Sequence, residues 1–196
     1  MRETLRILRS EHFALISLLQ TMLLMLAESR SRAMAPDFAA LRAILFYVDE
    51  FPEKRHHRKE SELLFPKLRA RTPLARALMD HLDEDHARGE ARVRELAHAL
   101  TAFELLGEPR RTAFEQAAAR YVDFYRQHML LEEREVFPLA DSALLPEDWD
   151  ELDAAMARFA DPLAGAVPEE EYRALFARIL NLVPAPLGLG EPVPPG

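Results

Sequence analysis

The chain has 196 residues, of which 49% are hydrophobic and 30% charged, and these proportions are typical of a soluble globular protein built around one main domain. Its formal net charge of -8 argues against a nucleic-acid partner, because such a partner favours a basic surface. The sequence contains no cysteine, which excludes disulfides, thiolate metal ligands and cysteine nucleophiles and is compatible with a cytoplasmic location.

The first stretch, from about Glu3 to Arg30, carries apolar residues at helical spacing and predicts a long amphipathic helix. His12 lies inside its apolar stripe. The most apolar run, residues 14–27, is shorter than the roughly 20 residues that a membrane span requires, and three polar residues interrupt it. We therefore expect a buried helix face rather than a membrane anchor, and no secretory signal is evident.

A second helix is expected from about Pro36 to Arg71, with Pro52 kinking or briefly interrupting it. It contains the sequence HHRKESELLFP, in which His56 is followed four residues later by Glu60 and then by Phe-Pro. Residues four apart project from the same helix face, so this imidazole and this carboxylate are aimed at the same point.

The next two helices repeat this arrangement. A third helix, starting at Thr72 and Pro73, carries His86 in its apolar row, as the first helix carries His12. The fourth contains HMLLEEREVFP, in which Glu132 follows His128 by four residues and Phe-Pro comes next. The matched order and similar spacing indicate two like αα-hairpins, which would face each other as an all-α four-helix bundle with pseudo-twofold symmetry over residues 1–145.

Two shorter helices are expected after the bundle, near residues 147–160 and 168–182. We assign them to a C-terminal helical extension, residues 146–182. Residues 183–196 are rich in proline and glycine and are expected to form an irregular tail.

Six polar side chains should converge at mid-bundle if this pattern holds. They are His12, His56, Glu60, His86, His128 and Glu132. A buried carboxylate needs a positively charged partner, and no lysine or arginine recurs at matching positions in both hairpins, so metal ions are the expected partners. Nitrogen and carboxylate oxygen without sulfur suit iron, manganese or zinc, and two glutamates between symmetric halves can bridge two ions.

Each feature taken alone also has a plainer interpretation. A single histidine on an apolar face, such as His12 or His86, is typical of a hydrogen-bonded core residue. Either His-x-x-x-Glu pair could be an exposed ion pair on a solvated helix face. The repetition of the whole layout favours the metal site over these alternatives.

Four further polar residues are placed outside the metal ligands. We expect His57 to lie in an outer shell or at the surface, because no acid follows it by four residues. His81 should point away from His86 and is kept as a reserve ligand. Glu90 is expected to form a salt bridge rather than to join the ligands, and His98 should be exposed.

These pieces together resemble the hemerythrin-like family, also called the HHE cation-binding domain. The segments that carry the resemblance span roughly residues 3 to 141, and they are EHFALISLL, YVDEFPEKRHHRKESELLFPKL, DHARGEARVREL and YRQHMLLEEREVFPLA. The resemblance implies an up-down-up-down four-helix bundle with two non-haem iron ions, oxo- or hydroxo-bridged, and no haem. It implies that the six residues above are the ligands and that Glu60 and Glu132 bridge the irons.

The sequence departs from the oxygen-carrying hemerythrins in two places. They have a further histidine four residues before the third-helix ligand, where this chain has Leu82. Their last acid follows its histidine by five residues, whereas Glu132 follows His128 by four. The chain therefore resembles bacterial hemerythrin-like proteins more than the reversible oxygen carriers.

The function that the resemblance implies is binding of O2, NO or peroxide for sensing, storage or detoxification. Gly89, one turn from His86, could leave space for a ligand pocket. The missing fifth histidine motivates an alternative, a di-iron peroxidase or NO-reducing enzyme, and the C-terminal extension motivates an iron- or oxygen-responsive regulatory module. We expect a cytoplasmic protein without nucleic-acid or membrane partners, and leave a homodimer open.

Overall fold

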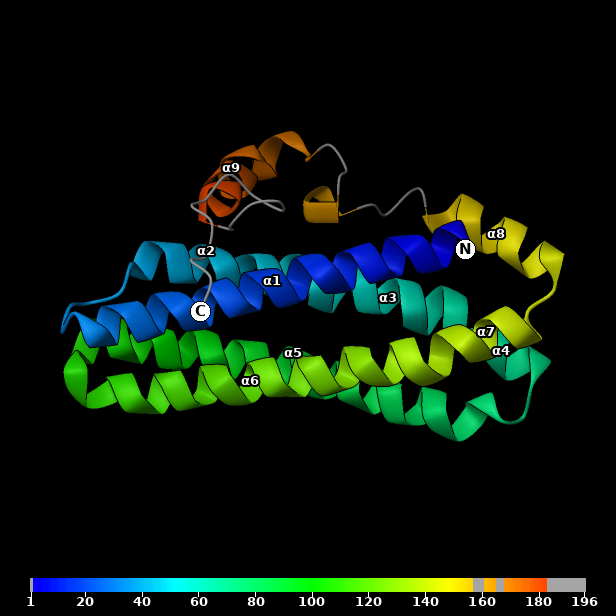
Figure 1. Ribbon diagram of the computed structural model, residues 1–196, viewed down its shortest axis with the longest axis horizontal. Helices are drawn as coiled ribbons and strands as arrows, with labels where there is room; N and C mark the ends of the chain where they lie inside the picture. Colours follow the sequence, from blue (N-terminus) through cyan, green and yellow to red (C-terminus); the bar gives the residue numbers. More distant parts are fainter. Residues whose placement is uncertain (1, 157–160, 165–167, 183–196) are drawn as a thin grey trace.

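The computed structural model describes residues 2–156, 161–164 and 168–182 and has four long antiparallel helical arms packed side by side (Figure 1). This confirms the predicted all-α four-helix bundle. The first arm is one helix, and the second runs without a break from Phe38 to Arg71. The bounds of the elements in the four arms are α1 (Glu3–Ser31), α2 (Phe38–Val48), η1 (Asp49–His56), α3 (His57–Lys59), η2 (Glu60–Leu64), α4 (Phe65–Arg71), α5 (Ala75–Leu106), η3 (Glu108–Arg110), α6 (Arg111–Leu131), η4 (Glu132–Val136) and α7 (Phe137–Ala143).

Pro52 does not break the second arm. It lies inside η1, which is a π-helix rather than an α-helix. Proline lacks an N–H, and its ring clashes with the carbonyl four residues earlier, so a wider turn relieves the crowding. At the end of η1 the N–H of His57 donates to the carbonyl of Pro52, five residues back. The predicted disturbance is therefore a widening of the helix directly before His57.

The two Phe-Pro pairs have the same local effect. Pro66 follows the π-helical segment η2, and Pro138 follows the π-helical segment η4. In each copy the phenylalanine N–H donates to the carbonyl of the glutamate five residues back, Glu60 in η2 and Glu132 in η4. The repeated Phe-Pro thus gives both arms a wide turn that begins at the predicted ligand.

The boundaries of α5 follow from local chemistry. The sequence places a cap at Thr72 and the first helical residue at Pro73; Thr72 is extended with ψ 133°, as a cap is, but the helix begins at Ala75. The residue before a proline is pushed out of helical geometry, and Pro73 has this effect on Thr72. At the other end Gly107 has φ 75°, a left-handed conformation that glycine adopts without strain, and the predicted break lies there.

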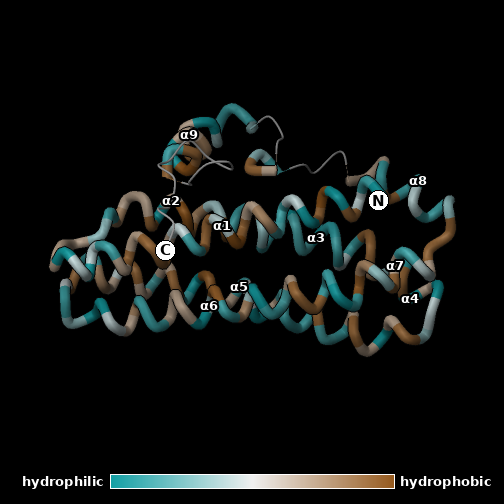
Figure 2. The backbone as a smooth tube through the Cα atoms, viewed as in Figure 1, coloured by the Kyte–Doolittle hydropathy of each residue, from teal (hydrophilic) through white to brown (hydrophobic). Residues whose placement is uncertain are grey.

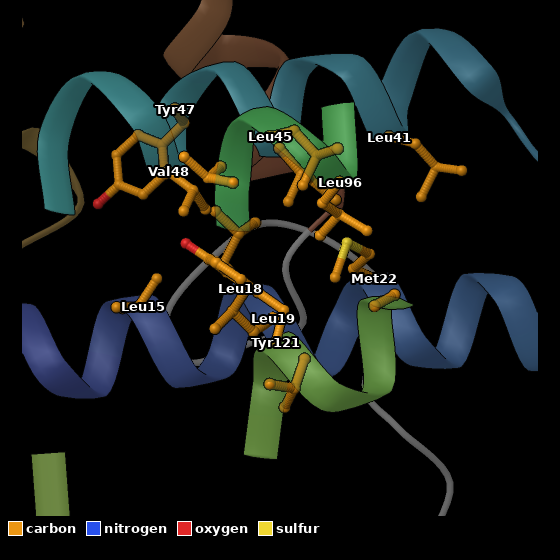
Figure 3. Close-up of a cluster of buried hydrophobic side chains, with 14 of the residues drawn as sticks. Leu15, Leu18, Leu19, Met22, Leu41, Leu45, Tyr47, Val48, Leu96 and Tyr121 are labelled. Atoms are coloured by element: carbon orange, nitrogen blue, oxygen red, sulfur yellow. The ribbon is translucent and has the colours of Figure 1, made fainter. Parts of the chain in front are cut away.

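Two apolar clusters fill the bundle, one toward each end, and the polar residues of interest lie between them. The larger cluster is formed by α1, α2, α5 and α6, and includes Leu18, Leu19, Met22 and Tyr121 (Figure 3). The smaller one includes Trp149 and the two Phe-Pro phenylalanines. Hydrophobic and hydrophilic residues alternate along every arm (Figure 2), as expected for helices with one face buried.

Helix α1 has the length and composition of a membrane span, with a hydropathy of 1.4 over its most apolar window. Half of that window is buried inside the bundle. The buried residues include Leu18, Leu19 and Met22, each with no exposed surface. The apolar side of α1 therefore packs against the other arms.

The C-terminal extension lies against the outside of the bundle (Figure 1). Helix α8 (Pro146–Met156) buries Trp149 beside α1, and α9 (Arg173–Leu182) packs on α2 after the short turns η5 (Pro162–Ala164) and η6 (Glu170–Tyr172). The first predicted helix of the extension is thus described to Met156, and its last four residues lie outside the described part. The predicted tail, residues 183–196, also lies outside it, and the domain boundaries stay predictions.

Candidate metal centre

The six side chains that the sequence predicts as ligands all lie buried at mid-bundle. Their exposed fractions are 7% or less, and both glutamates are fully buried. His12 comes from α1, His56 and Glu60 from the second arm, His86 from α5, and His128 and Glu132 from the fourth arm. The structure therefore brings together residues from all four arms.

These residues form two overlapping donor groups, in each of which the candidate ligand atoms lie within 4.8 Å of one another. The first group is His12, His56, Glu60 and Glu132, and the second is Glu60, His86, His128 and Glu132. Both groups contain both glutamates. The arrangement fits two metal ions that share a pair of carboxylates.

The distances within the first group suit a common ion. Nε2 of His12 lies 3.2 Å from Nε2 of His56 and 3.2 Å from Oε2 of Glu132, and Nε2 of His56 lies 3.4 Å from Oε2 of Glu60. Two ligands bound at about 2.1 Å to one ion lie roughly 3.0 to 3.4 Å apart, for angles between 90° and the tetrahedral value. These side chains therefore already stand at ligand spacing.

The second group has comparable spacing. Nε2 of His128 lies 3.2 Å from Oε1 of Glu132, and Nε2 of His86 lies 3.5 Å from Oε2 of Glu60 and 3.8 Å from Oε1 of Glu132. Each glutamate thus faces histidines of both groups. This is the contact pattern expected of a bridging carboxylate.

His57 is buried, so the surface position that the sequence allowed is wrong, and the outer-shell position stays a prediction. The exposed fraction of His57 is 4%, and its ring stacks on that of His86 with 4.0 Å between centroids. With His86 and His128 it forms a third group of possible metal ligands. Successive helical residues point about 100° apart, so adjacent histidines can face two different donor groups. His56 faces the first group, and His57 faces His86 and His128 of the second. The second arm therefore offers a nitrogen near His86 that Leu82 cannot offer.

A usable sequence signal for His57 was its acid on the other side. Glu53 precedes His57 by four residues, and Oε2 of Glu53 lies 3.2 Å from Nδ1 of His57. In the pattern His-x-x-x-Glu the acid follows the histidine, whereas Glu53 precedes His57. In this reversed order the carboxylate lies next to Nδ1 of the histidine.

Every histidine of the cluster has an oxygen facing its second ring nitrogen. Metal-binding histidines commonly direct this N–H to a carboxylate or hydroxyl, which fixes the ring and leaves the other nitrogen for the ion. The five distances from Nδ1 are 3.1 Å for His12 to Glu133, 2.7 Å for His56 to Glu11, 3.2 Å for His57 to Glu53, 2.9 Å for His86 to Ser61 and 3.7 Å for His128 to Asp85.

Residues 3–140 match the family described as the hemerythrin HHE cation binding domain. The chain belongs to this family. The match covers the four arms and confirms the resemblance seen in the sequence. No curated protein and no solved structure shows a significant match to the chain.

The HHE domain contains a buried lysine that supports His56 indirectly. Lys59 has an exposed fraction of 2% and forms an ion pair with Glu11, which is itself 4% exposed. Burial raises the pKa of Glu11, but its contacts with His56 and Lys59 outweigh this and lower it. Lys59 thus helps to keep a negative charge behind His56. The contact joins residues 48 positions apart, and nothing in the sequence pattern indicated it.

The two carboxylates shared by both donor groups, Glu60 and Glu132, lack hydrogen-bond partners among the described residues at all four oxygens. Burial, together with the negative charge of Glu132, raises the pKa of Glu60 well above its usual value. Burial also disfavours ionised Glu132, but the surrounding histidines, His128 first, lower its pKa. Without a cation, burial and the neighbouring carboxylate therefore favour the protonated form of Glu60. Buried oxygens that no protein group satisfies are what a metal pair would satisfy.

Two histidines have the protonation state that a ligand needs. Burial lowers the pKa of His56 to about 4 and the pKa of His57 well below its usual value, the latter with help from the neighbouring histidines. Both rings are therefore neutral at neutral pH. A neutral imidazole has a lone pair for an ion, whereas an imidazolium has none.

Other predicted positions of the HHE domain lie outside the donor groups. The side chain of His81 is 52% exposed and its Nε2 lies 3.6 Å from Asp85. Glu90 pairs with Arg94 at 3.6 Å, and His98 is exposed.

Gly89 does not open a ligand pocket. A Cβ added there would lie 2.3 Å from the Tyr125 hydroxyl and 2.8 Å from Glu53 Oε2. The space left free by the missing side chain is filled by the Tyr125 hydroxyl and the Glu53 carboxylate.

Proposed function

We propose that this HHE-domain protein holds two iron ions at mid-bundle and binds O2, NO or peroxide there for sensing, storage or detoxification. The observation that carries the proposal is the unequal sharing of histidines. The first position has His12 and His56 with two shared carboxylates, and the second has those carboxylates with His57, His86 and His128. Fewer protein donors at the first position leave room for a small ligand on that side.

Iron fits the donor set and the proposed ligands. Imidazole nitrogen and carboxylate oxygen without sulfur suit iron, manganese or zinc, and only iron and manganese among these change oxidation state readily. When bound, iron supplies the electrons that an oxygen or peroxide ligand accepts. The protein residues supply position, charge balance and exclusion of water.

The walls of the site are apolar and are suited to exclude water. Leu15 and Leu82 are 3% and 0% exposed, and Phe65 and Phe137 stack against His86 and His12 with 5.7 Å between centroids in both pairs. This apolar lining keeps water from the donor atoms and strengthens their electrostatic interactions. A small neutral ligand enters such a site at low cost.

His12, at the first position, is in contact with a partly exposed residue. Glu133, whose side chain is 40% exposed, faces Nδ1 of His12 at 3.1 Å. His12 lowers the pKa of Glu133, so the carboxylate is ionised and can hold the N–H of His12 in place. His12 is therefore oriented from the surface side of the bundle.

Metal analysis and the absorption spectrum of aerobically purified protein test the proposal. We expect about two irons per chain, a near-ultraviolet band from the bridged pair, and a spectral change on adding azide or NO to the appropriate oxidation state. His128→Ala should lose most of the iron, and His98→Ala, at an exposed position, should retain it. Purification with only zinc, or with no metal after supply of iron, would contradict the proposal.

A second candidate is the di-iron enzyme, with peroxidase or NO-reducing activity. His57 removes its original motive, since the expected shortage of histidine at the second position is made up. A different observation now favours it, because two buried tyrosines, Tyr121 and Tyr125, donate hydrogen bonds to Glu53 beside that position. Steady loss of peroxide or NO by the iron-loaded protein indicates an enzyme, and a stable adduct without turnover indicates a binding protein.

A further inference from the structure

A second buried polar cluster lies next to the donor groups and meets them where Glu53 faces Nδ1 of His57. Glu53, Tyr121 and Tyr125 are each 2% exposed or less. The hydroxyl of Tyr121 donates to Oε1 of Glu53 at 2.7 Å, and the hydroxyl of Tyr125 donates to the same oxygen. Two phenylalanines with an apolar residue at position 53 would fill the space without desolvating any polar group. Packing alone therefore does not account for this cluster.

Tyr125 connects the cluster to the proposed second metal position. Its ring is parallel to that of His57, with 5.7 Å between centroids and an interplanar angle of 1°. It also meets the ring of His128 edge to face at 5.9 Å. The hydroxyl of Tyr125 donates to Glu53, and Glu53 faces Nδ1 of His57. Tyr125 is therefore connected to His57 both by its ring and, through Glu53, by its hydroxyl.

Tyr121 connects the same cluster to the outside. Its ring lies 4.9 Å from that of Tyr125, centroid to centroid. It also lines a groove of about 620 Å³ between α5 and α6. The groove contains the ring of Phe124, over which Arg92 stacks at 4.2 Å, and the side chain of Arg120. Glu95 and Asp123 also line the groove, so a small aromatic molecule could stack on the Arg92 guanidinium and place its hydroxyl groups between arginine donors and carboxylate acceptors.

We propose that Tyr121 and Tyr125 pass electrons, one at a time, from a phenolic or hydroquinone reductant in the α5–α6 groove to peroxide bound at the metal pair. The inference rests on the proposed function, with peroxide as the ligand. Tyr125 gives an electron through His57, its O–H bond breaks, and the proton moves along the existing hydrogen bond to Glu53. Tyr125 then regains an electron by way of Tyr121 and its proton from Glu53.

The overall reaction balances with the reductant as the source of both electrons; it releases two protons to solvent and peroxide takes up two from solvent, because the relay proton only moves between Tyr125 and Glu53. One hydrogen peroxide is reduced to two waters while one hydroquinone is oxidised to quinone. The O–O bond of peroxide and the two O–H bonds of hydroquinone break, and two O–H bonds form in the waters. The tyrosines and Glu53 return to their starting states after two electrons have passed.

Electron paramagnetic resonance of frozen samples tests the relay. Iron-loaded protein mixed with hydrogen peroxide should give a tyrosyl radical signal, and Tyr125→Phe should reduce it at least tenfold. Tyr121→Phe should leave a radical that hydroquinone quenches at least tenfold more slowly. Tyr172→Phe is the matched control, because this tyrosine lies in the extension and its hydroxyl pairs with Glu50, and it should behave as wild type.

Glu53→Gln provides a second variant that keeps the shape of the cluster. An amide oxygen still accepts from both tyrosines but takes no proton, so the radical yield per bound iron should fall while circular dichroism remains as in wild type. Loaded wild-type protein that consumes peroxide without any radical, or a signal unchanged in Tyr125→Phe, would overturn the relay alone. Protein that binds no iron would overturn the proposed function and this inference with it.

Discussion

Nδ1 of His57 lies 3.2 Å from Oε2 of Glu53, the residue one helical turn before it. The ring of His57 is buried and stacks on that of His86. With His86 and His128 it forms a group that could hold a metal ion, although the third arm has only one of these histidines. The contact also gives the first of five predictions.

Replacing His57 with alanine should remove a ligand of the second ion and leave the first nearly intact. We expect its affinity for that ion to fall by about 100-fold or more, because even residues that only orient a ligand contribute about 10- to 100-fold. Iron per chain after competition with a chelator is the measurement. His98→Ala, which changes an exposed histidine, is the control, and equal iron retention by both variants would show that His57 is not a ligand.

Replacing Glu11 with glutamine should weaken the first position and destabilise the bundle. The amide holds His56 less firmly, and we expect metal affinity to fall about 10- to 100-fold. Lys59 is left as an unpaired buried charge, which costs about 3–5 kcal/mol of the free energy of unfolding. Urea unfolding of metal-free protein measures the second effect.

A double variant separates these two effects of Glu11. Adding Lys59→Met to Glu11→Gln should restore most of the stability, because the unpaired charge is gone, but should not restore metal affinity. Glu62→Gln is the control, because the Glu62 side chain is 57% exposed and pairs only across the helix surface with Arg58. If the single variant and this control unfold alike, the buried ion pair has no stabilising role.

Chelation should lower the melting temperature of the protein. Metal at 100 times its dissociation constant contributes about 2.7 kcal/mol per site, or roughly 5–10 °C for a chain of this size. Differential scanning calorimetry of loaded and chelated samples measures the shift. His128→Ala, with a damaged second position, should show a smaller shift, and a melting temperature unchanged after verified removal of metal would count against the site.

Replacing Gly89 with alanine should destabilise the protein by about 1–3 kcal/mol, because the new methyl group meets the Tyr125 hydroxyl and Glu53. Tyr125→Phe removes the nearer of these contacts and should partly restore stability in the double variant. A double-mutant cycle with chemical denaturation measures the coupling between the two positions. Additive effects would mean that Gly89 and Tyr125 do not constrain each other.

The stability of the protein should depend on pH through Asp161. Burial raises the pKa of Asp161 to about 6, although Tyr47 donates a hydrogen bond to it at 2.6 Å. Between about pH 4 and pH 6 the folded protein therefore keeps a proton that the unfolded chain releases, so this contribution to stability falls as pH rises.

Asp161→Asn should remove that dependence. Relative to wild type, the variant should gain up to about 3 kcal/mol in the free energy of unfolding between pH 4 and pH 7. Other titrating groups near Asp161, namely Glu11, Lys59 and Tyr47, are the same in both proteins, so the difference isolates the aspartate. Urea unfolding of metal-free protein at the two pH values measures it, and a constant difference would contradict the prediction.

The fold and most of the donor set could be predicted because both rest on repetition. His56 with Glu60, and His128 with Glu132, are spaced to share a helix face, and a second copy of the layout rarely arises by chance. The helical spacing of apolar residues predicted the four arms, with their ends placed within a few residues of those in the structure. The start of α5 illustrates such a difference, since the sequence predicts Pro73 as its first residue and the helix begins at Ala75.

The missed features depend on contacts between distant residues or on backbone geometry. The Lys59–Glu11 pair joins two arms, and helical spacing within one arm carries no information about it. His57 was missed because its acid precedes it, and Gly89 was misread because the groups that need its space, Glu53 and Tyr125, lie on other arms. Lys59 and Gly89 become visible only when the arms are placed against one another, whereas the spacing of Glu53 and His57 lies within one arm.

The wide turns at Glu60 and Glu132 bear on how the protein exchanges its ions. The missing N–H of Pro66 and Pro138 is permanent, so these turns persist whether the site is full or empty. The backbone of the folded chain therefore helps to orient the carboxylates, and binding of a cation requires less reorganisation. A site oriented in this way discriminates between metal ions by ionic radius and charge, because its carboxylates cannot readily move to fit an ion of another size.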